Sequence, residues 1–410
     1  MNLITSFLLI LVLTTQIFAQ QKYFGVDGKN ITDRDGKVFV MKGVNLGNWL
    51  VPEGYMFKFN KANSPTRVNN VITELIGPAE TKKFWIEFQN NYITYDDIKF
   101  IKASGVNSIR VPFNYKLFCD ETYLWNTNSR GFELIDRLLE WCRIENLPIV
   151  LDMHAAPGGQ TGDNIDDSYD YPWLMVDEDS QNQIIEIWKS IASHYANEPL
   201  VLGYDLLNEP IAHYFEEENL NGNLEPLYKK ITASIREVDQ NHIIILGGAK
   251  WNTDFSVFGK PFDEKLVYEF HKYWMPPVQK EIQEYVDFRD KHNVPIYMGE
   301  SGENDDDWVK KFRELLDDNS ISWHFWPYKK MDNTRGPVNF NKPENYDLVN
   351  GYAEFDRSTY KSVRENRPDI VKVKLALNGY LEQCKFENCF PNEGYMDALK
   401  LDYSKKAKIN

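Results

Sequence analysis

Two glutamates stand at the ends of short apolar runs, where a carboxyl group is costly to bury without a use. Glu209 directly follows the run 201–208, and Glu300 closes the run 295–300. Two such groups can break an acetal bond together: one donates a proton to the leaving oxygen, and the other attacks the carbon as a carboxylate. In retaining glycoside hydrolysis the two carboxyl groups lie about 5–5.5 Å apart. We therefore predict that carboxyl oxygens of Glu209 and Glu300 lie about 4.5–6 Å apart.

The ends of other apolar runs carry polar and aromatic side chains that could serve the same reaction. Guanidinium, phenol and imidazole groups can orient a carboxylate or bind hydroxyl groups, and an indole can stack on a sugar ring. The histidines lack the His-x-His and His-Glu-x-x-His spacings of hydrolytic metal sites, so we predict neither a metal nor a cofactor. The candidate positions are Arg110, His154, Asn208, His271, Tyr273 and Trp326.

These side chains can meet only if the strands that carry them lie in one sheet. Eight short apolar runs alternate with amphipathic stretches, a pattern that indicates a parallel sheet with covering helices. In a chain of 410 residues this predicts an α/β fold with a closed (β/α)8 barrel, whose active site lies at the C-terminal strand ends. A doubly wound sheet is the alternative, although no glycine-rich fingerprint follows the first strand. The expected strands are 38–45, 108–113, 148–154, 201–208, 242–247, 265–271, 295–300 and 322–326, and the expected helices are 95–104, 132–146, 181–195, 224–239, 278–292 and 306–318.

Three segments stand outside this alternation. Residues 26–39 contain Asp-Gly turns at Asp27-Gly28 and Asp35-Gly36, which predict a hairpin that closes the bottom of the barrel. Residues 63–91 form an insertion with a helical pattern of its own. A C-terminal extension begins at about residue 339. Because no linker or change of composition interrupts the chain, we expect residues 20–410 to form a single domain.

The amino-acid composition indicates which classes of molecule the protein binds. With 46 basic and 61 acidic residues the formal net charge is −15, which argues against a nucleic acid, whose phosphates need a positive field. Trp, Tyr and Phe together make up 14% of the chain. Aromatic rings in this number exceed the needs of a core and are suited to stacking on the flat faces of sugars.

The N-terminal residues 1–19 read as a signal peptide, with an apolar run over 3–13 and a small residue, Ala19, at the expected cleavage site. The apolar run is shorter than the roughly 20 residues that a bilayer span needs, so we expect no stable membrane insertion. We therefore expect a secreted protein, extracellular or periplasmic, and a monomer.

The four cysteines allow three pairings. Cys384 and Cys389 lie five residues apart and could close a small loop in an oxidising compartment. Cys119 follows a strand at the top of the barrel, whereas Cys142 lies late on a descending helix, roughly 15 Å or more below. That separation exceeds the limit of about 7 Å for a disulfide, so Cys384–Cys389 is the one bridge we expect.

Taken together in chain order, these motifs resemble glycoside hydrolase family 5, and the resemblance extends from Val44 to Trp326. It implies that Glu209 is the acid/base and Glu300 the nucleophile. It further implies that Asn208 binds the sugar 2-hydroxyl, that Arg110 and Tyr273 orient Glu300, that His154 and His271 bind hydroxyls, and that Trp326 lies under the sugar at the cleavage site. The motifs are Ile109-Arg110-Val111-Pro112, Asp152-Met153-His154, Asn208-Glu209-Pro210, His271-Lys272-Tyr273, Gly299-Glu300-Ser301 and Trp326.

Within the family, the stretches 43–53 and 156–160 are most similar to the exo-β-1,3-glucanase branch. This resemblance implies that Glu53 binds the terminal sugar. The polar loop 158–170 could close that end of the site, with Asp163 and Asn164 as further hydroxyl partners. We therefore expect a β-glucan or β-glucoside substrate that is shortened from its non-reducing end. A solvated loop position is the alternative for Glu53.

Other activities of the same family remain open at this point. An endo-β-1,4-glucanase (cellulase), a mannanase or a β-glucosidase would use the same pair of carboxyl groups on a different sugar or in a more open cleft. A different class of protein, a non-catalytic carbohydrate-binding barrel, would have no need for two carboxyl groups at bonding distance.

Overall fold

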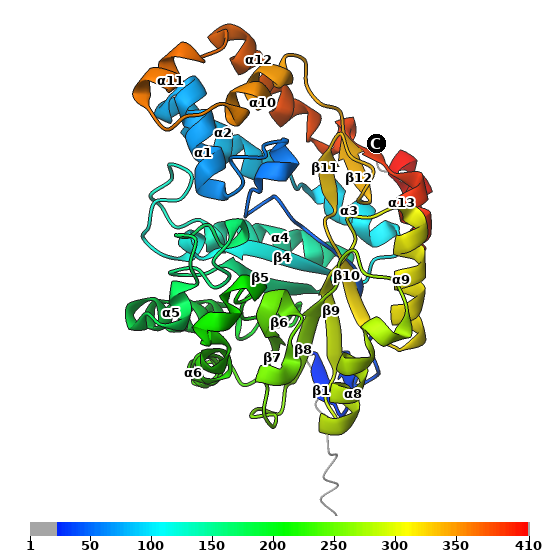
Figure 1. The fold of residues 1–410 in the computed structure, drawn as a ribbon. Helices are drawn as coiled ribbons and strands as arrows, with labels where there is room; N and C mark the ends of the chain where they lie inside the picture. Colours follow the sequence, from blue (N-terminus) through cyan, green and yellow to red (C-terminus); the bar gives the residue numbers. More distant parts are fainter. Residues whose placement is uncertain (1–22, 409–410) are drawn as a thin grey trace, which may run out of the picture.

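The computed structural model describes residues 23–408, so the signal peptide expected at 1–19 lies outside the described residues. Eight parallel strands close into a barrel in which β10 pairs with both β3 and β9 (Figure 1). The predicted (β/α)8 barrel is thereby confirmed, and each expected strand is found within a few residues of its expected bounds. The barrel strands are β3 (Lys42–Asn45), β4 (Ser108–Asn114), β5 (Ile149–Ala155), β6 (Val201–Asp205), β7 (Ile243–Gly247), β8 (Leu266–His271), β9 (Ile296–Glu300) and β10 (Ser322–Phe325).

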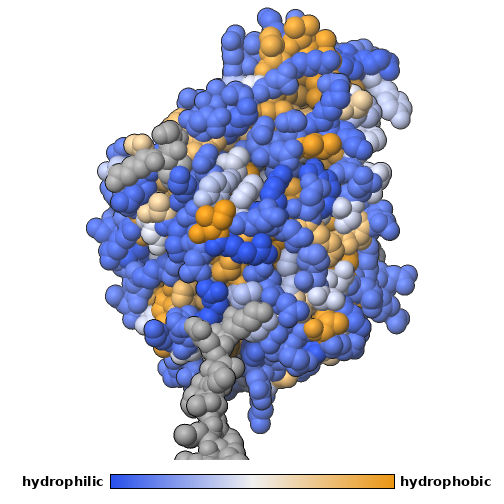
Figure 2. Space-filling view, turned by 180° about the vertical axis from the view of Figure 1, so that it is seen from behind, coloured by the Kyte–Doolittle hydropathy of each residue, from blue (hydrophilic) through white to orange (hydrophobic). Residues whose placement is uncertain are grey.

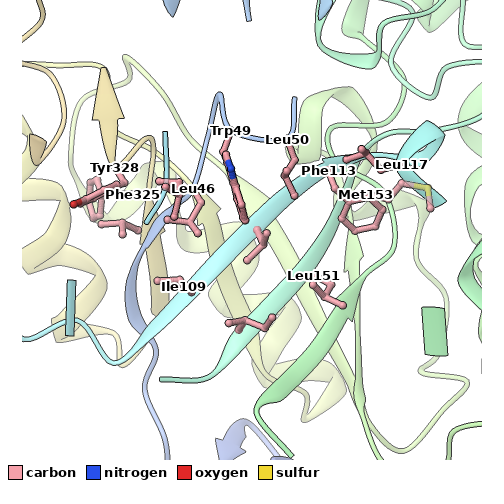
Figure 3. Close-up of a cluster of buried hydrophobic side chains, with 14 of the residues drawn as sticks. Leu46, Trp49, Leu50, Ile109, Phe113, Leu117, Leu151, Met153, Phe325 and Tyr328 are labelled. Atoms are coloured by element: carbon pink, nitrogen blue, oxygen red, sulfur yellow. The ribbon is translucent and has the colours of Figure 1, made fainter. Parts of the chain in front are cut away.

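Alternation along the strands separates the core from the site. In β4 and β5 the odd-numbered residues point out of the barrel, where Ile109, Phe113, Leu151 and Met153 join one buried cluster (Figure 3). Their even-numbered neighbours point inward, because successive side chains of a strand lie on opposite faces. Both faces are covered, so the strands read as nearly continuous apolar runs. The polar residues within them are therefore confined to the interior of the barrel.

The amphipathic stretches form helices that cover the outside of the barrel. The acidic run before the helix at 306–318 has a structural role, since the Asp305 side chain accepts a hydrogen bond from the Trp308 backbone N–H and caps the helix. After β7 no long helix follows among the described residues, and the chain forms the short helix α7 (Ala249–Asn252) and the 3-10 turn Phe255–Val257. The covering helices are α3 (Tyr95–Ala103), α4 (Gly131–Glu145), α5 (Glu178–Tyr195), α6 (Leu224–Arg236), α8 (Gln283–His292) and α9 (Asp306–Asp318).

The N-terminal hairpin consists of β1 (Gly25–Asp27) and β2 (Asn30–Thr32), joined at Gly28 with φ of 54°. Its apolar side chains belong to a second buried cluster with residues from the lower parts of β5 to β9. Hairpin and neighbouring residues therefore cover the bottom of the barrel, as expected. That cluster contains Phe24, Ile31, Met41, Val150, Leu202, Ile243, Ile245, Val267 and Tyr297.

The insertion and the C-terminal extension pack on each other. The insertion forms α1 (Pro65–Ile76) and α2 (Pro78–Asn91), and α12 (Ile370–Gln383) lies against both (Figure 1). A small sheet of β11 (Lys329–Met331), β12 (Val338–Phe340) and β13 (Phe390–Pro391) ties the extension to the last barrel strand. The remaining helices of the extension are α10 (Tyr346–Glu354), α11 (Tyr360–Glu365) and α13 (Glu393–Ala398).

The face drawn in Figure 2 is mostly hydrophilic, with an apolar area at the end of the molecule formed by the extension. On helix α12 of the extension, the side chains of Ile370, Val371 and Leu375 are exposed. Within residues 23–408 no helix combines the length and the apolar character needed to cross a bilayer.

All four cysteines are free thiols, so the expected Cys384–Cys389 bridge is wrong in this structure, while Cys119 and Cys142 are unpaired as expected. The Cys389 thiol donates instead to the backbone carbonyl of Lys385, at 3.2 Å, in the turn that ends α12. Burial raises the pKa of Cys389 to about 11 and also raises that of Cys384. Both sulfurs are thereby kept as unreactive thiols, because the thiolate is the reactive form.

Candidate active site

A cavity of about 740 Å³ opens at the C-terminal ends of the barrel strands. Arg110 and Asn208 lie directly beneath it and are fully buried. The structure therefore brings the candidate residues of the sequence analysis to one place. The candidates that line the cavity are Glu53, His154, Asn164, Glu209, His271, Tyr273, Glu300 and Trp326.

The two catalytic candidates face each other across this cavity. Carboxylate oxygens of Glu209 and Glu300 lie within 4.8 Å of each other. Glu209 has a φ of 45°, a left-handed conformation that is uncommon for a residue with a side chain and typical of functional sites. Thr161 holds this turn by donating its hydroxyl hydrogen to the Glu209 carbonyl at 2.8 Å.

Glu300 is held as a carboxylate. The guanidinium of Arg110 donates to its Oε1 at 2.5 Å, and the Tyr273 hydroxyl donates to its Oε2 at 3.2 Å. Burial on its own would raise the pKa of Glu300, but the positive charges of His271, Arg110 and His154 outweigh burial and lower it. A buried, ionised carboxylate aimed into a cavity is suited to nucleophilic attack.

Arg110 is the centre of a charge cluster that the sequence analysis only partly foresaw. Besides Glu300, its guanidinium contacts Asp152 at 3.1 Å, Asp205 at 2.7 Å and Glu269 at 3.4 Å. Asp152 and Glu269 each lie two residues before a candidate histidine on the same strand. Because side chains two apart share a face of a strand, this spacing is the signal that could have revealed them.

His271 bridges two carboxyl groups. Its Nδ1 lies 2.9 Å from Glu209 Oε1, and its Nε2 lies 3.0 Å from Glu269 Oε1. Burial lowers the pKa of His271, but the charge of Glu300 and the hydrogen bonds to Glu209 and Glu269 outweigh it and raise the pKa to about 10. With both nitrogens engaged by carboxyl groups, the predicted hydroxyl-binding role of His271 remains a prediction.

Gly299 explains how Glu269 reaches His271. A Cβ atom at residue 299 would lie only 1.4 Å from Glu269 Oε1, so any side chain there would displace the carboxyl group. The glycine of the Gly299-Glu300 motif thus has a steric role in the site.

His154 and Trp326 line the cavity together, and Asn208 lies next to His154 beneath it. Asn208 accepts from Arg110 at 3.0 Å through Oδ1, so the predicted contact of its amide with the sugar 2-hydroxyl remains a prediction. The imidazole of His154 contacts Asp152 at 2.8 Å and stacks on Trp326, with the ring planes 2° apart and the centroids 5.2 Å apart. The indole N–H donates to the Tyr55 hydroxyl at 2.8 Å, which fixes the plane of the ring.

Glu53 is one of the residues that line the cavity. Its side chain is buried, and its Oε1 has no hydrogen-bond partner among the described residues. Burial has the largest effect on Glu53 and raises its pKa to about 8; the charge of His154 opposes this shift, and those of Glu300, Glu303 and Glu209 add to it. Such an oxygen is available to accept a hydrogen bond from a ligand, which would offset the free-energy cost of an unpaired buried acceptor. Asn164 and Asp163 line the same cavity.

The extension supports the loop that carries Glu53. Phe57, four residues further on, stacks on Tyr380 of α12, with centroids 4.9 Å apart and planes 7° apart. The Tyr346 hydroxyl of α10 donates to the Phe57 carbonyl at 3.2 Å. Residues of the C-terminal extension therefore help to place a candidate substrate-binding residue.

Trp251 is a further residue of the site, which the sequence analysis did not single out. It lines the cavity from α7, where Lys250, Trp251 and Asn252 have φ values of 54°, 58° and 58°. Three consecutive left-handed residues with side chains are strained. The indole packs edge-on against His213, 4.8 Å between centroids.

Two groups have the spacing of metal ligands, and both include Glu300. They are Asp152 with His154, and Glu209 with His271, each joined by Glu300 within 4.8 Å. The Arg110 guanidinium already forms an ion pair with Glu300, and its positive charge would repel a metal ion on the same carboxylate. The arrangement is better suited to acid/base and nucleophilic chemistry.

Comparison with known proteins agrees with this geometry. The chain is 28% identical over 346 residues to a beta-xylosidase of Phanerodontia chrysosporium, covering 75% of this chain and 71% of that protein. It is 26% identical to endoglucanase C of Acetivibrio thermocellus, covering 71% and 91%. It is 27% identical to a probable glucan 1,3-beta-glucosidase A of Aspergillus fumigatus, covering 58% and 56%.

Among solved structures, the rutinosidase from Aspergillus niger superposes with a TM-score of 0.57, at 21% identity over 72% of this chain and 91% of that one. At this identity the likeness concerns the fold. A model of the family described as "Cellulase (glycosyl hydrolase family 5)" matches residues 62–332, which include both catalytic candidates. This chain therefore belongs to glycosyl hydrolase family 5 and is a glycosidase.

Proposed function

We propose that this chain is a retaining β-glycosidase that releases single sugars from the non-reducing ends of β-glucans, with Glu300 as nucleophile and Glu209 as acid/base. The observation that carries the retaining mechanism is the separation of the two carboxyl groups, with oxygens within 4.8 Å. Inverting enzymes separate the two groups by about 6.5–9.5 Å to admit a water molecule.

The reaction divides into two displacements. Glu300 attacks the anomeric carbon while Glu209 protonates the leaving oxygen, which gives a glycosyl-enzyme. Glu209 then removes a proton from water, and the water displaces Glu300 with a second inversion. Arg110 and Tyr273 aim Glu300 at the carbon, since each holds one of its oxygens.

The exo mode of action rests on Glu53. Two adjacent hydroxyls of a terminal sugar could donate to its carboxyl group, and the Oε1 atom that lacks a partner would then be satisfied. Glu53 and Trp326 line the same cavity, and a chain that continued past this sugar would give up the terminal hydroxyl that bonds to Glu53.

Hydroxyl donors of a bound sugar favour the ionised form of Glu53, against the burial that raises its pKa in the free protein. Replacing Glu53 by glutamine should therefore weaken binding of the terminal sugar by roughly 1–3 kcal/mol, because glutamine offers one acceptor where a carboxylate offers two. The expected result is a rise in KM of roughly 5- to 140-fold with a smaller change in kcat. Steady-state kinetics on an aryl β-glucoside measure this. Glu121→Gln is the matched control, since Glu121 bonds Tyr115 and Gln183 outside the cavity. An unchanged KM in Glu53→Gln would remove the argument for the exo mode.

A second substrate class, terminal β-xylosides, is favoured by the similarity to a beta-xylosidase over 75% of the chain. Aryl β-glucoside and aryl β-xyloside therefore form the first comparison. Laminarin, cellulose, pustulan and mannan, with product analysis, form the second. Glucose as the main early product from laminarin supports the proposal, whereas a ladder of oligosaccharides would indicate an endo-acting enzyme.

We also propose that the protein acts outside the cytoplasm, on the ground of the apolar N-terminal segment. Mass analysis of the N-terminus of the protein recovered from the culture medium tests this: cleavage after Ala19 is expected, and an intact N-terminus inside the cell would contradict it.

A further inference from the structure

Two buried carboxyl groups beneath the catalytic glutamates are not used by the reaction described above. Asp205 on β6 and Glu269 on β8 are both fully buried, and both contact Nη2 of Arg110, at 2.7 and 3.4 Å. Their other oxygens, Asp205 Oδ1 and Glu269 Oε2, receive no hydrogen bond from any described donor. Two ionised carboxylates in this position would repel each other strongly, because little water is present to screen them.

The charges around Arg110 do not balance if every acid is ionised. Four carboxyl groups touch its guanidinium, and a fifth contacts His271. The available positive charges are Arg110 and, at most, the rings of His154 and His271. Some of these buried acids must therefore hold protons. Glu209 holds one when it acts as the acid, and one more is needed for neutrality. The five acids are Asp152, Asp205, Glu209, Glu269 and Glu300.

We propose that Asp205 is protonated and donates a hydrogen bond to Glu269. Glu269 itself stays ionised and keeps His271 as an imidazolium that faces Glu209. This inference rests on the proposed function, since it takes Glu209 as the acid. Asp205 and Glu269 are positioning residues, because neither reaches the cavity and both act through His271.

The geometry of His271 supports the second part of the proposal, in which Glu269 keeps His271 positively charged. Its two nitrogens face carboxyl groups on opposite sides, at 2.9 Å to Glu209 and 3.0 Å to Glu269, so each nitrogen has an acceptor for a hydrogen. When Glu209 gives its proton to the leaving oxygen, negative charge develops on Glu209. A fixed positive group at this distance stabilises that charge in the transition state.

The protonation of Asp205, which is the first part of the proposal, has independent support. Burial, followed by the neighbouring charge of Glu269, raises the pKa of Asp205 well above its usual value, although Arg110 opposes the shift. Burial likewise raises the pKa of the two tyrosines that face the pair, so they contribute no charge at neutral pH. The charged and titratable groups that face Asp205 and Glu269 are Arg110, Asp152, Tyr228, His271, Tyr297 and Glu300.

The variant Asp205→Asn tests where the proton lies. Its amide carbonyl can accept from Arg110 as Asp205 Oδ2 does, and its NH2 group can donate to Glu269 as the shared proton would. The wild type should lose stability between about pH 4 and pH 7, because only the unfolded state ionises Asp205 there. The Asp205→Asn variant has no ionisable group at this position and does not lose this stability. The Tm of the variant minus the Tm of the wild type should therefore increase as the pH is raised.

The variant Glu269→Gln tests the action on Glu209. Without the carboxylate, His271 loses one of the two acceptors that favour its charged form, so it stabilises ionised Glu209 less. The loss in kcat should therefore grow with the pKa of the leaving group, from about 3-fold with dinitrophenyl β-glucoside to about 100-fold with phenyl β-glucoside. KM should change little, and Asp205→Asn should lose no more than about 3-fold with either substrate.

Three results would overturn the proposal. If Asp205→Asn is less stable than the wild type by the same amount at about pH 4 and at about pH 7, Asp205 is ionised in the folded protein. If it loses as much activity as Glu269→Gln, the two residues do not have different roles. If the Glu269→Gln loss is equal for all leaving groups, Glu269 supports the fold without acting through the acid. Should the wild type cleave no aryl β-glycoside, the proposed function fails, while the Tm comparison still tests the position of the proton.

Discussion

Replacing Glu300 by alanine is expected to lower the hydrolysis of every aryl β-glycoside by at least about 10⁴-fold. Without the carboxylate no glycosyl-enzyme can form, whatever the leaving group. Rapid-mixing measurements with dinitrophenyl β-glucoside should show a burst of phenolate with the wild type if release of the sugar is slow, and none with Glu300→Ala. The fold should persist, because Arg110 keeps its other carboxylate partners.

Glu209→Ala is the matched variant, since it removes the same group from the other side of the same cavity. It removes the proton donor, which matters little when the leaving group is already a stable anion. Dinitrophenyl β-glucoside should therefore still show the burst, while a phenyl β-glucoside should be cleaved very slowly.

Azide provides a sharper distinction, because it can occupy the space of either missing carboxyl group. In Glu209→Ala it should attack the glycosyl-enzyme and give a β-glycosyl azide. In Glu300→Ala it should attack the substrate directly and give the α-anomer, since a single displacement inverts the centre. The same anomer from both variants would mean that the two roles are wrongly assigned.

Replacing Arg110 by leucine is expected to destabilise the fold by about 3–5 kcal/mol, because it leaves several buried carboxylates without their cation. Asp152, Asp205, Glu269 and Glu300 all contact this guanidinium, and its side chain is fully buried. Urea unfolding followed by circular dichroism measures the loss. The loss should shrink at low pH, where the carboxyl groups take up protons and no longer need the cation.

Arg313→Leu is the control for the removal of a buried arginine. Arg313 is nearly as inaccessible as Arg110, but its partners Asp317 and Glu314 have side chains that are 20% and 45% exposed. These partners can be hydrated once the arginine is gone, so the loss should be smaller and the activity retained. Equal losses in the two variants would contradict the view that Arg110 neutralises a closed charge cluster.

The sequence alone predicted the barrel and most of the residues at its upper end. Each expected strand is present because a parallel sheet covered on both faces requires apolar side chains in nearly every position, a pattern that is visible without coordinates. The candidate residues could be named because they interrupt or follow those runs. Since all strands of such a barrel end at one face, Glu209 and Glu300 had to lie near each other.

The sequence carries one signal for the residues that act from within the barrel, the two-residue spacing of Asp152 and Glu269 from the candidate histidines, and it carries none for Asp205. Asp152, Asp205 and Glu269 lie inside apolar runs, and which of them meet Arg110 depends on the register between strands that are 40 to 160 residues apart. The role of the extension was equally hidden, because the stack of Phe57 on Tyr380 joins segments far apart in the chain. The disulfide prediction was wrong because proximity in sequence does not fix the direction of a side chain, and Cys389 donates to the Lys385 carbonyl instead.

The chemistry was thus determined by residue types at strand ends, which the sequence displays. The charge balance beneath that chemistry was decided only by the tertiary structure. A carboxyl group in a sequence is simply an acid, and its charge depends on what surrounds it. Closure of the barrel removes water from Asp205 and places Glu269 beside it, and these two changes determine which acid keeps its proton.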